Sequence, residues 1–151
     1  MYKKKPFFIV FESVEGCGKS YQSKKLFNKL KKKQIDTILT REPGGTKSSE
    51  LIRNLILKDY FTKNSKEKFD KYTDTLLYLA ARNEHIKNKI KPALIKKKII
   101  ICDRFVDSTI AYQVHGKKVD INFINNIHKK ILQGVTPNIV FILKVSMESS
   151  L

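Results

Sequence analysis

The fold of this chain is decided by the stretch Phe7-Phe8-Ile9-Val10-Phe11-Glu12-Ser13-Val14-Glu15-Gly16-Cys17-Gly18-Lys19-Ser20. An apolar run that leads into a glycine-rich turn and then a basic segment predicts a strand, a phosphate-binding loop and a helix. In such a loop, backbone N–H groups and the helix N-terminus hold a polyphosphate. Lys19 is then the side chain expected to reach the β- and γ-phosphates, and Ser20 is the hydroxyl expected to bind Mg²⁺.

Ser13 is a departure from the strict loop pattern Gly-x-x-x-x-Gly-Lys-Ser/Thr, which has glycine at this position. Its Cβ falls where backbone and phosphate crowd, so it is expected to weaken nucleotide binding unless the loop relaxes around it. Because Gly16, Gly18, Lys19 and Ser20 remain, we expect the loop still to bind phosphate and Ser13→Gly to improve ATP binding modestly. The alternative interpretation is a glycine-rich turn before a basic helix, with no ligand.

Length and composition indicate one globular domain with a core of ordinary size, because the chain has 151 residues and 41% apolar content. No apolar run reaches the length of a membrane span, and the N-terminal residues do not follow the signal-peptide pattern. Cys17 and Cys102 form no metal-binding pattern. We therefore expect two free thiols and a cytoplasmic protein.

The net charge of +17 comes mainly from lysine, since the chain has 27 Lys and only 4 Arg. Binding to nucleic acid would explain such a charge. We favour a compositional bias, because the lysines form short runs typical of solvated helix ends, and we expect no specific nucleic-acid partner. Where lysine supplies the general charge, each arginine is expected to serve a planar, bidentate contact. The four are Arg41, Arg53, Arg82 and Arg104.

Alternating apolar and amphipathic segments predict strands over 7–12, 37–40, 99–102 and 138–145, and helices over 18–33, 48–58 and 70–89. Further helices are expected after Pro92, from Val106, and from Asp120 to Gly134, with a connection over 59–69. The expected apolar faces are Tyr21, Leu26, Phe27 and Leu30 in one helix, and Leu51, Ile52, Leu55 and Ile56 in the next. This order predicts a parallel sheet with helices on both faces.

In a sheet of this kind the ligand lies beyond the carboxyl ends of the strands. Three polar segments follow strands and are expected to meet there: 13–20, 41–46 and 103–113. Asp103 ends the third strand and is suited to Mg²⁺, and Arg104 is suited to gripping a second phosphate. An ordinary strand-ending salt bridge is the alternative.

Tyr78 and Arg82 are four residues apart in the helix expected over 70–89, so they share a face. An aromatic ring beside a guanidinium suits a nucleobase, the ring by stacking and the guanidinium by bonding a carbonyl edge. The alternative is a core tyrosine with a surface arginine.

Four motifs together resemble the thymidylate kinase family, whose members phosphorylate dTMP to dTDP with ATP. They are residues 11–20 (FESVEGCGKS), 40–46 (TREPGGT), 80–84 (AARNE) and 103–113 (DRFVDSTIAYQ). The resemblance covers residues 7–145 in the family's order and spacing. It implies the P-loop nucleoside monophosphate kinase fold, with ATP and Mg²⁺ as the other reactants, a role in dTTP biosynthesis, and pairing into a homodimer.

The resemblance also implies roles for individual residues. Lys19, Asp103, Arg104 and Glu15 are expected to be catalytic, and Ser20, Asp103 and Glu15 to hold the metal. ATP phosphates are expected at Gly16, Cys17, Gly18, Lys19, Ser20 and Tyr21. The residues expected to bind dTMP are Glu15, Pro43, Arg53, Tyr78, Arg82, Arg104, Ser108, Thr109, Tyr112 and Gln113, with Tyr78 stacking on thymine and Arg82 bonding its carbonyl.

Two further departures from the family pattern concern Gly16 and the end of the chain. One subgroup of the family has a catalytic Arg at position 16, whereas this chain resembles the bacterial type that carries its Arg in a later lid. The chain stops at Leu151, where Ser146-Met147-Glu148 is expected to begin a helix. We therefore expect 1–151 to be a single kinase domain without the fifth strand and the lid, and to turn over slowly.

Two rival functions remain at this stage. One is a kinase for another nucleoside or nucleotide, which would share the phosphate loop but read a different base. The other is a non-catalytic basic protein that binds nucleic acid. A GTPase-like switch is disfavoured, because the chain has no guanine-reading Asn-Lys-x-Asp motif.

Overall fold

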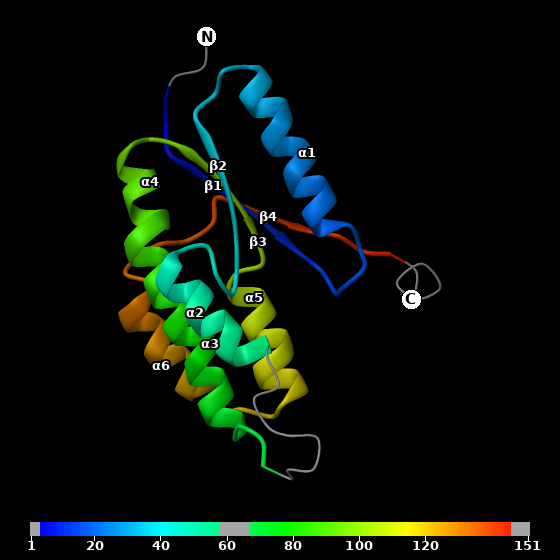
Figure 1. Ribbon diagram of the computed structural model, residues 1–151, viewed down its shortest axis with the longest axis vertical. Helices are drawn as coiled ribbons and strands as arrows, with labels where there is room; N and C mark the ends of the chain where they lie inside the picture. Colours follow the sequence, from blue (N-terminus) through cyan, green and yellow to red (C-terminus); the bar gives the residue numbers. More distant parts are fainter. Residues whose placement is uncertain (1–3, 58–66, 146–151) are drawn as a thin grey trace.

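The computed structural model describes residues 4–57 and 67–145, and a parallel sheet lies at its centre (Figure 1). The strands are β1 (Phe7–Glu12), β2 (Thr37–Arg41), β3 (Ile99–Asp103) and β4 (Ile139–Ile142). Their order is β2-β3-β1-β4, and each neighbouring pair is parallel. The predicted parallel sheet is confirmed. Most of the connection expected over 59–69 lies outside the described residues. The helix expected from Ser146 lies wholly outside them.

The helices follow the predicted order closely. They are α1 (Lys19–Lys32), α2 (Lys47–Leu57), α3 (Lys71–His85), the π-helical turn η1 (Ile86–Ile90), α4 (Lys91–Ile95), α5 (Val106–Thr109), the π-helical turn η2 (Ile110–Gly116) and α6 (Ile121–Ile131). The Asp70 and Asp120 carboxylates accept from Tyr72 N and Asn122 N and so cap α3 and α6. The stretch from α3 through η1 to α4 is continuous. Its widened turn comes just before Pro92, which has no N–H to donate.

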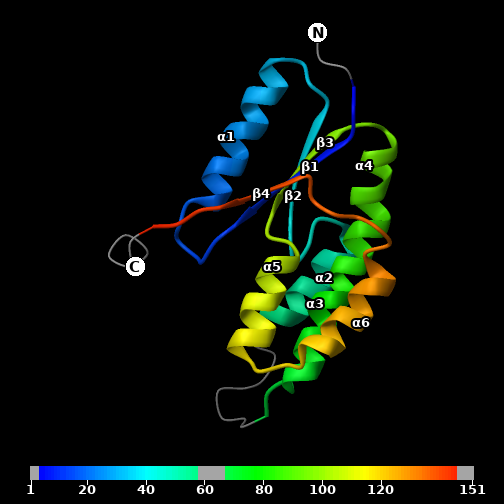
Figure 2. The same ribbon diagram turned by 180° about the vertical axis from the view of Figure 1, so that it is seen from behind.

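The two faces of the sheet are covered by different helices, because successive side chains of each strand point to opposite faces. On one face α1 packs Leu26, Phe27 and Leu30 against Ile9, Phe11, Ile99 and Ile101. On the other, η1 and α4 cover Phe8, Val10, Ile100 and Cys102. Figures 1 and 2 show α1 and α4 on opposite sides of the strands. Because helices cover both faces of the sheet, a ligand site is expected beyond the carboxyl ends of the strands.

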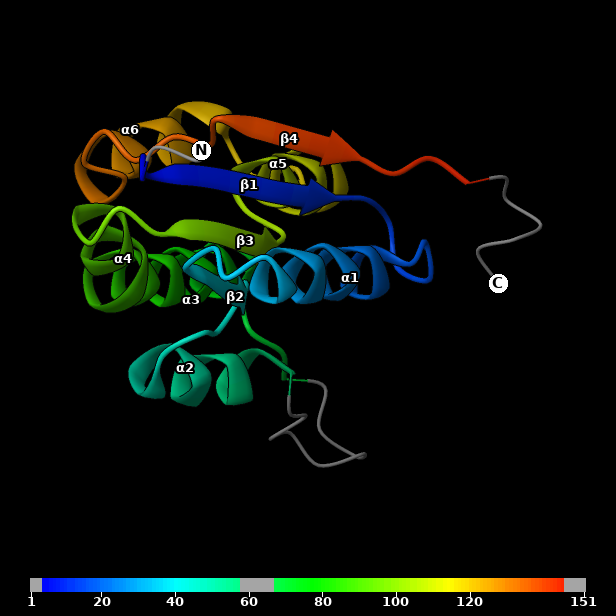
Figure 3. The same ribbon diagram turned by 90° about the horizontal axis from the view of Figure 1, so that it is seen from above.

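Two details of the expected helix faces are wrong. Tyr21 is 66% exposed and does not belong to the buried face of α1. It precedes Leu30 by two and a half helical turns at about 3.6 residues per turn, so it points the opposite way. In α2, Leu51 is 70% and Leu55 40% exposed. This helix packs against α3 and lies beyond the β2 edge of the sheet (Figure 3), so only one side of it is covered.

The strand β4 lies at the edge of the four-stranded sheet and pairs with β1. The Phe141 ring stacks on Phe11 with 5.2 Å between centroids. All four residues of β4 are nevertheless exposed, and Ile142 reaches 73%. An apolar edge of this kind is prone to association.

Candidate active site

The phosphate loop joins β1 to α1 and is shaped by two glycines with left-handed backbone, Gly16 at φ 78° and Gly18 at φ 80°. The Lys19 side chain is buried, and its Nζ donates to the Val14 carbonyl at 2.6 Å. Burial, followed by the charge of Arg104, lowers the pKa of Lys19 below its ordinary value. The ammonium is therefore held inside the loop, close to where a polyphosphate would sit.

Ser20 and Asp103 meet at the start of α1, where the Ser20 hydroxyl donates to the Asp103 carboxylate at 2.5 Å. Hard oxygen donors of this kind fit Mg²⁺, which is commonly bound by one or two protein oxygens together with waters and substrate phosphates. Within the described residues there is no group of three or more His, Cys, Asp and Glu side chains that would form an all-protein metal site. Glu15 lies apart, in the wall of the neighbouring pocket.

That pocket opens beside the phosphate loop and lies between the loop, the segment after β2, the second half of α2, and the helices α3, α5 and η2. Its lining residues are Glu15, Glu42, Pro43, Arg53, Leu57, Tyr78, Arg82, Arg104, Phe105, Ser108, Thr109, Tyr112 and Gln113. All ten residues predicted to bind dTMP are among them. Hereafter we call it the acceptor pocket, after the role that the sequence analysis predicts for these residues. Residues taken from four separate motifs therefore line a single cavity.

Arg104 stands at the loop end of the acceptor pocket in a left-handed backbone conformation, φ 72°. Such strain in a non-glycine residue is typical of functional sites. Its Nη1 donates to the Ser13 carbonyl, the Ser108 hydroxyl and the Tyr112 hydroxyl at 3.2, 3.3 and 3.4 Å. In the described part of the chain, Nη1 is the only nitrogen of the Arg104 side chain that donates to protein acceptors. The Nε and Nη2 donors thus remain available for an anion.

Arg82 has the opposite character, because all three of its guanidinium nitrogens contact protein acceptors. Nε and Nη2 both lie 2.7 Å from Glu42 Oε2, and Nη2 also donates to the Phe105 carbonyl at 2.8 Å. Nη1 donates to Thr109 Oγ1 at 2.8 Å and to His128 Nε2 at 2.9 Å. Arg82 is only 4% exposed. The alternative of a surface arginine is therefore wrong, and a base in the pocket would have to share a donor already in use.

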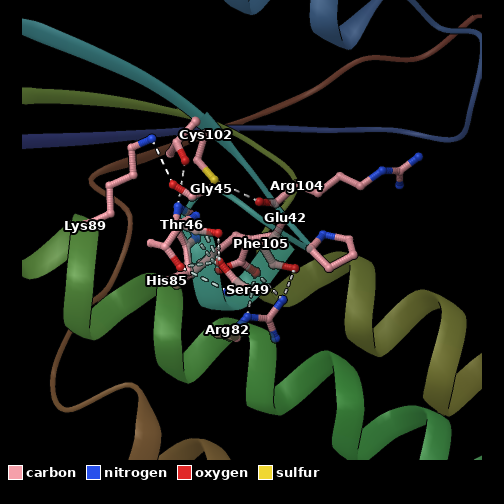
Figure 4. A network of polar contacts seen from close by, with 12 residues as sticks. Glu42, Gly45, Thr46, Ser49, Arg82, His85, Lys89, Cys102, Arg104 and Phe105 are labelled. Atoms are coloured by element: carbon pink, nitrogen blue, oxygen red, sulfur yellow. Dashed lines mark hydrogen bonds and ion pairs between the residues drawn. The ribbon is translucent and has the colours of Figure 1, made fainter. Parts of the chain in front are cut away.

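Glu42 joins Arg82 to His85 in a buried network (Figure 4). Its Oε1 accepts from His85 Nδ1 at 3.0 Å, and His85 Nε2 lies 2.7 Å from Thr40 Oγ1. Burial raises the pKa of Glu42, but Arg82 and His85 outweigh burial and hold it below its ordinary value. Gly45 packs against this network, where a Cβ would lie 2.5 Å from Thr40 Oγ1.

His128 on α6 supplies the remaining partner of Arg82. A guanidinium only donates, so His128 Nε2 accepts and the ring is neutral. Burial and the Arg82 charge lower the pKa of His128 to about 4. No sequence signal pointed to His128, a single histidine on an amphipathic helix. Glu42 belongs to the 40–46 motif, but only its buried contacts with Arg82 and His85 show that it joins these two side chains.

Glu12 is a second buried carboxylate that the sequence did not single out. It accepts from Phe105 N at 2.7 Å and from the Ser108 hydroxyl at 2.6 Å. These contacts tie the end of β1 to the start of α5, which carries Ser108 and Thr109 into the acceptor pocket. Tyr78 lies half-buried across the pocket, and burial followed by Asp74 raises the pKa of its phenol, which therefore stays neutral.

A parallel sheet covered on both faces, a phosphate loop after its first strand and an arginine-lined pocket beside that loop define a P-loop nucleoside monophosphate kinase. The thymidylate kinase family model matches residues 11–151. The thymidylate kinase of Halothermothrix orenii is 40% identical over 144 residues, which cover 95% of this chain and 67% of that protein. That of Wolbachia pipientis wMel is 43% identical over 146 residues, covering 95% and 70%.

The solved structure of thymidylate kinase from Ehrlichia chaffeensis superposes with a TM-score of 0.83 at 40% identity, covering 96% of this chain and 80% of that one. The chain spans about two thirds of the length of the curated relatives it matches. It belongs to the thymidylate kinase family, whose enzymes transfer a phosphoryl group to dTMP. In the part of the chain that the structure describes, no helix has the length and apolar character needed to cross a membrane.

Proposed function

We propose that this chain binds dTMP in the acceptor pocket and transfers to it the γ-phosphoryl group of ATP, which the phosphate loop holds. The observation that carries the proposal is the position of Arg104. Arg104 lines the acceptor pocket with Nε and Nη2 free of protein acceptors in the described chain, while its Nη1 contacts the Ser13 carbonyl at the start of the phosphate loop. A monophosphate bound to this guanidinium would face the loop that holds the donor.

In the transfer, an oxygen of the dTMP phosphate attacks the γ-phosphorus, and the bond to the β–γ bridging oxygen breaks, so ADP leaves with that electron pair. Positioning and charge neutralisation supply the catalysis. Arg104 lowers the repulsion between two anions, and Lys19 exchanges the Val14 carbonyl for phosphate oxygens. Mg²⁺, held by Ser20 and Asp103, would neutralise charge on the ATP phosphates.

Among the other residues that line the acceptor pocket, we expect Tyr78 to stack on the base, and Thr109, Gln113 and Arg82 to form the wall around it. Gln113 and Thr109 are each only 2% exposed, so their polar groups are fixed by the fold. Arg82 contributes chiefly as a buried group whose three nitrogens already contact protein acceptors. We therefore expect a base carbonyl to form a shared hydrogen bond with Arg82, weaker than the bond that an unengaged guanidinium would give.

The proposal is tested by comparing dTMP with dCMP, dUMP and AMP as acceptors and as ligands in calorimetry. We expect dTMP to bind most tightly, and Arg104→Gln to weaken dTMP by about 10- to 100-fold while ATP affinity changes little. Arg41→Gln is the matched control, because Arg41 pairs with Glu50 outside the acceptor pocket. Equal dTMP affinity in the Arg104 and Arg41 variants would remove the proposal. Preference for another monophosphate would favour the rival kinase.

We further propose that the chain forms one kinase domain, pairs into a homodimer and works in the cytoplasm. The exposed Leu51 and Leu55 on α2 support pairing through helices, since apolar patches of this kind mark association surfaces. The free thiols Cys17 and Cys102 fit a reducing compartment. Analytical ultracentrifugation of the parent and a Leu51→Lys, Leu55→Lys variant tests the dimer, which the double variant should dissociate.

A further inference from the structure

Ser13 occupies the one position where this phosphate loop departs from the strict glycine pattern, and the structure shows what its side chain does. The Ser13 hydroxyl donates to the Leu143 carbonyl at 2.7 Å. Its backbone is outside the left-handed region that would require glycine. The residue is therefore accommodated without strain, and its hydroxyl has a specific partner 130 positions away in the sequence.

The hydroxyl bond is the second of two hydrogen bonds that join the end of β1 to the residue after β4. Leu143 N donates to the Glu12 carbonyl at 2.9 Å, and Ser13 Oγ donates back to Leu143 O. Glycine at position 13 would leave only the first of these bonds. It would also widen the backbone freedom of the peptide that follows, since glycine has no Cβ to restrict φ and ψ.

The peptide that Ser13 fixes is the one that contacts Arg104. The Ser13 carbonyl accepts from Arg104 Nη1 at 3.2 Å, the shortest of the three Nη1 contacts. The Arg104 backbone is itself tied to β1, because its N–H donates to the Phe11 carbonyl at 2.9 Å. Figure 4 shows the Arg104 side chain extending away from the network around Glu42. The guanidinium thus depends on the phosphate loop for part of its orientation.

We propose that Ser13 is a positioning residue, which fixes the first peptide of the phosphate loop against Leu143 and thereby orients Arg104 for the acceptor phosphate. The proposal rests on the proposed function insofar as Arg104 binds the dTMP phosphate. It replaces the expected gain in ATP binding from Ser13→Gly with a loss of dTMP binding, because glycine removes an anchor instead of relieving a crowded loop. It also links the acceptor side of the site to the chain that leaves β4.

The test compares Ser13→Gly, Ser13→Ala and Ser13→Thr in the full 151-residue chain. Ala keeps the Cβ and removes the hydroxyl, whereas Thr keeps the hydroxyl. Thr37→Val is the matched control, because Thr37 also donates a side-chain hydroxyl to a backbone carbonyl, Ile35 O at 3.0 Å, but at the opposite end of β2 from the site. The measurements are dTMP and ATP affinity by calorimetry, and amide hydrogen exchange at Leu143 and Arg104.

We expect Ser13→Gly and Ser13→Ala to weaken dTMP by about 3- to 10-fold, the range for one neutral hydrogen bond, and to leave ATP affinity nearly unchanged. Amide exchange at Leu143 and Arg104 should rise in both variants by a similar factor. Ser13→Thr should retain parental values, and Thr37→Val should change neither measurement at these sites.

Hydrogen exchange separates this proposal from the proposed function, because it needs no substrate. Unchanged exchange in Ser13→Ala overturns the anchor, whatever the dTMP affinity. Faster exchange with parental dTMP affinity overturns the positioning role. A loss confined to Ser13→Gly also overturns it, because the Cβ and not the hydroxyl would then be responsible. A parent chain that binds no dTMP refutes the proposed function, while the exchange data still decide whether Ser13 anchors the loop.

Discussion

Glu42→Gln is the substitution that most directly tests the buried network around Arg82. The change keeps the shape of the side chain and removes its charge. Glu42 Oε2 lies 2.7 Å from both Nε and Nη2 of Arg82, and Oε1 accepts from His85. Both partners of the Arg82–Glu42 pair are only 4% exposed at the side chain. The variant therefore leaves a buried guanidinium without its counter-charge.

Removing one partner of a buried pair costs about 3–5 kcal/mol. For a domain of this size, that loss lowers Tm by roughly 6–20 °C. The loss should also depend on pH. Because Arg82 and His85 hold the pKa of Glu42 below its ordinary value of 4.5 in spite of burial, its stabilisation is complete above that value and is lost as the pH falls further. Glu42→Gln should lack this acid-side decline.

The assay is chemical and thermal unfolding at pH 7 and at acid pH, with Glu50→Gln as the matched control. Glu50 also pairs with an arginine, Arg41 at 3.1 Å, but the two side chains are 53% and 40% exposed. An exposed pair contributes about 0–1 kcal/mol. If Glu42→Gln and Glu50→Gln destabilise the chain equally at pH 7, the buried network does not carry the stability assigned to it.

Three further outcomes follow from individual contacts. His128→Gln should remove a loss of about 1.6 kcal/mol that the parent suffers between pH 6.5 and pH 5, because burial and Arg82 lower the His128 pKa to about 4 and the unfolded chain takes up the proton first. Unfolding at both pH values checks this, and an equal acid-side loss in the variant would contradict it. Lys19→Ala should weaken ATP binding by about 10- to 100-fold in calorimetry, with Lys24→Ala, an exposed lysine of α1, as the control. Undiminished ATP affinity would reject the phosphate loop. Ile142→Lys should reduce self-association in sedimentation velocity, since Ile142 is 73% exposed on the edge strand β4. An unchanged distribution of sedimentation coefficients would show that association uses another surface.

Local patterns in the sequence were sufficient for the elements, whereas most of the residues that line the acceptor pocket came from the resemblance to a known family. The run from Phe7 to Ser20 contains its own strand, turn and helix start, so β1, the phosphate loop and α1 could be predicted from neighbours in the chain. The polar segments that follow each strand had to meet, because parallel strands share one carboxyl edge. The resemblance of four motifs then supplied the family and the expected substrate.

Only the tertiary structure decided how the two pocket arginines differ. Arg82 and Arg104 are the same residue type in equally recognisable motifs, yet all three guanidinium nitrogens of Arg82 contact protein acceptors, and Arg104 leaves Nε and Nη2 open in the described chain. The partners that make this difference lie 40 and 46 positions from Arg82, at Glu42 and His128. Hydrogen-bond saturation and burial depend on such distant contacts, and no local pattern encodes them. For the same reason the sequence alone predicted that Ser13 weakens nucleotide binding by the loop, whereas in the fold its hydroxyl donates to the Leu143 carbonyl.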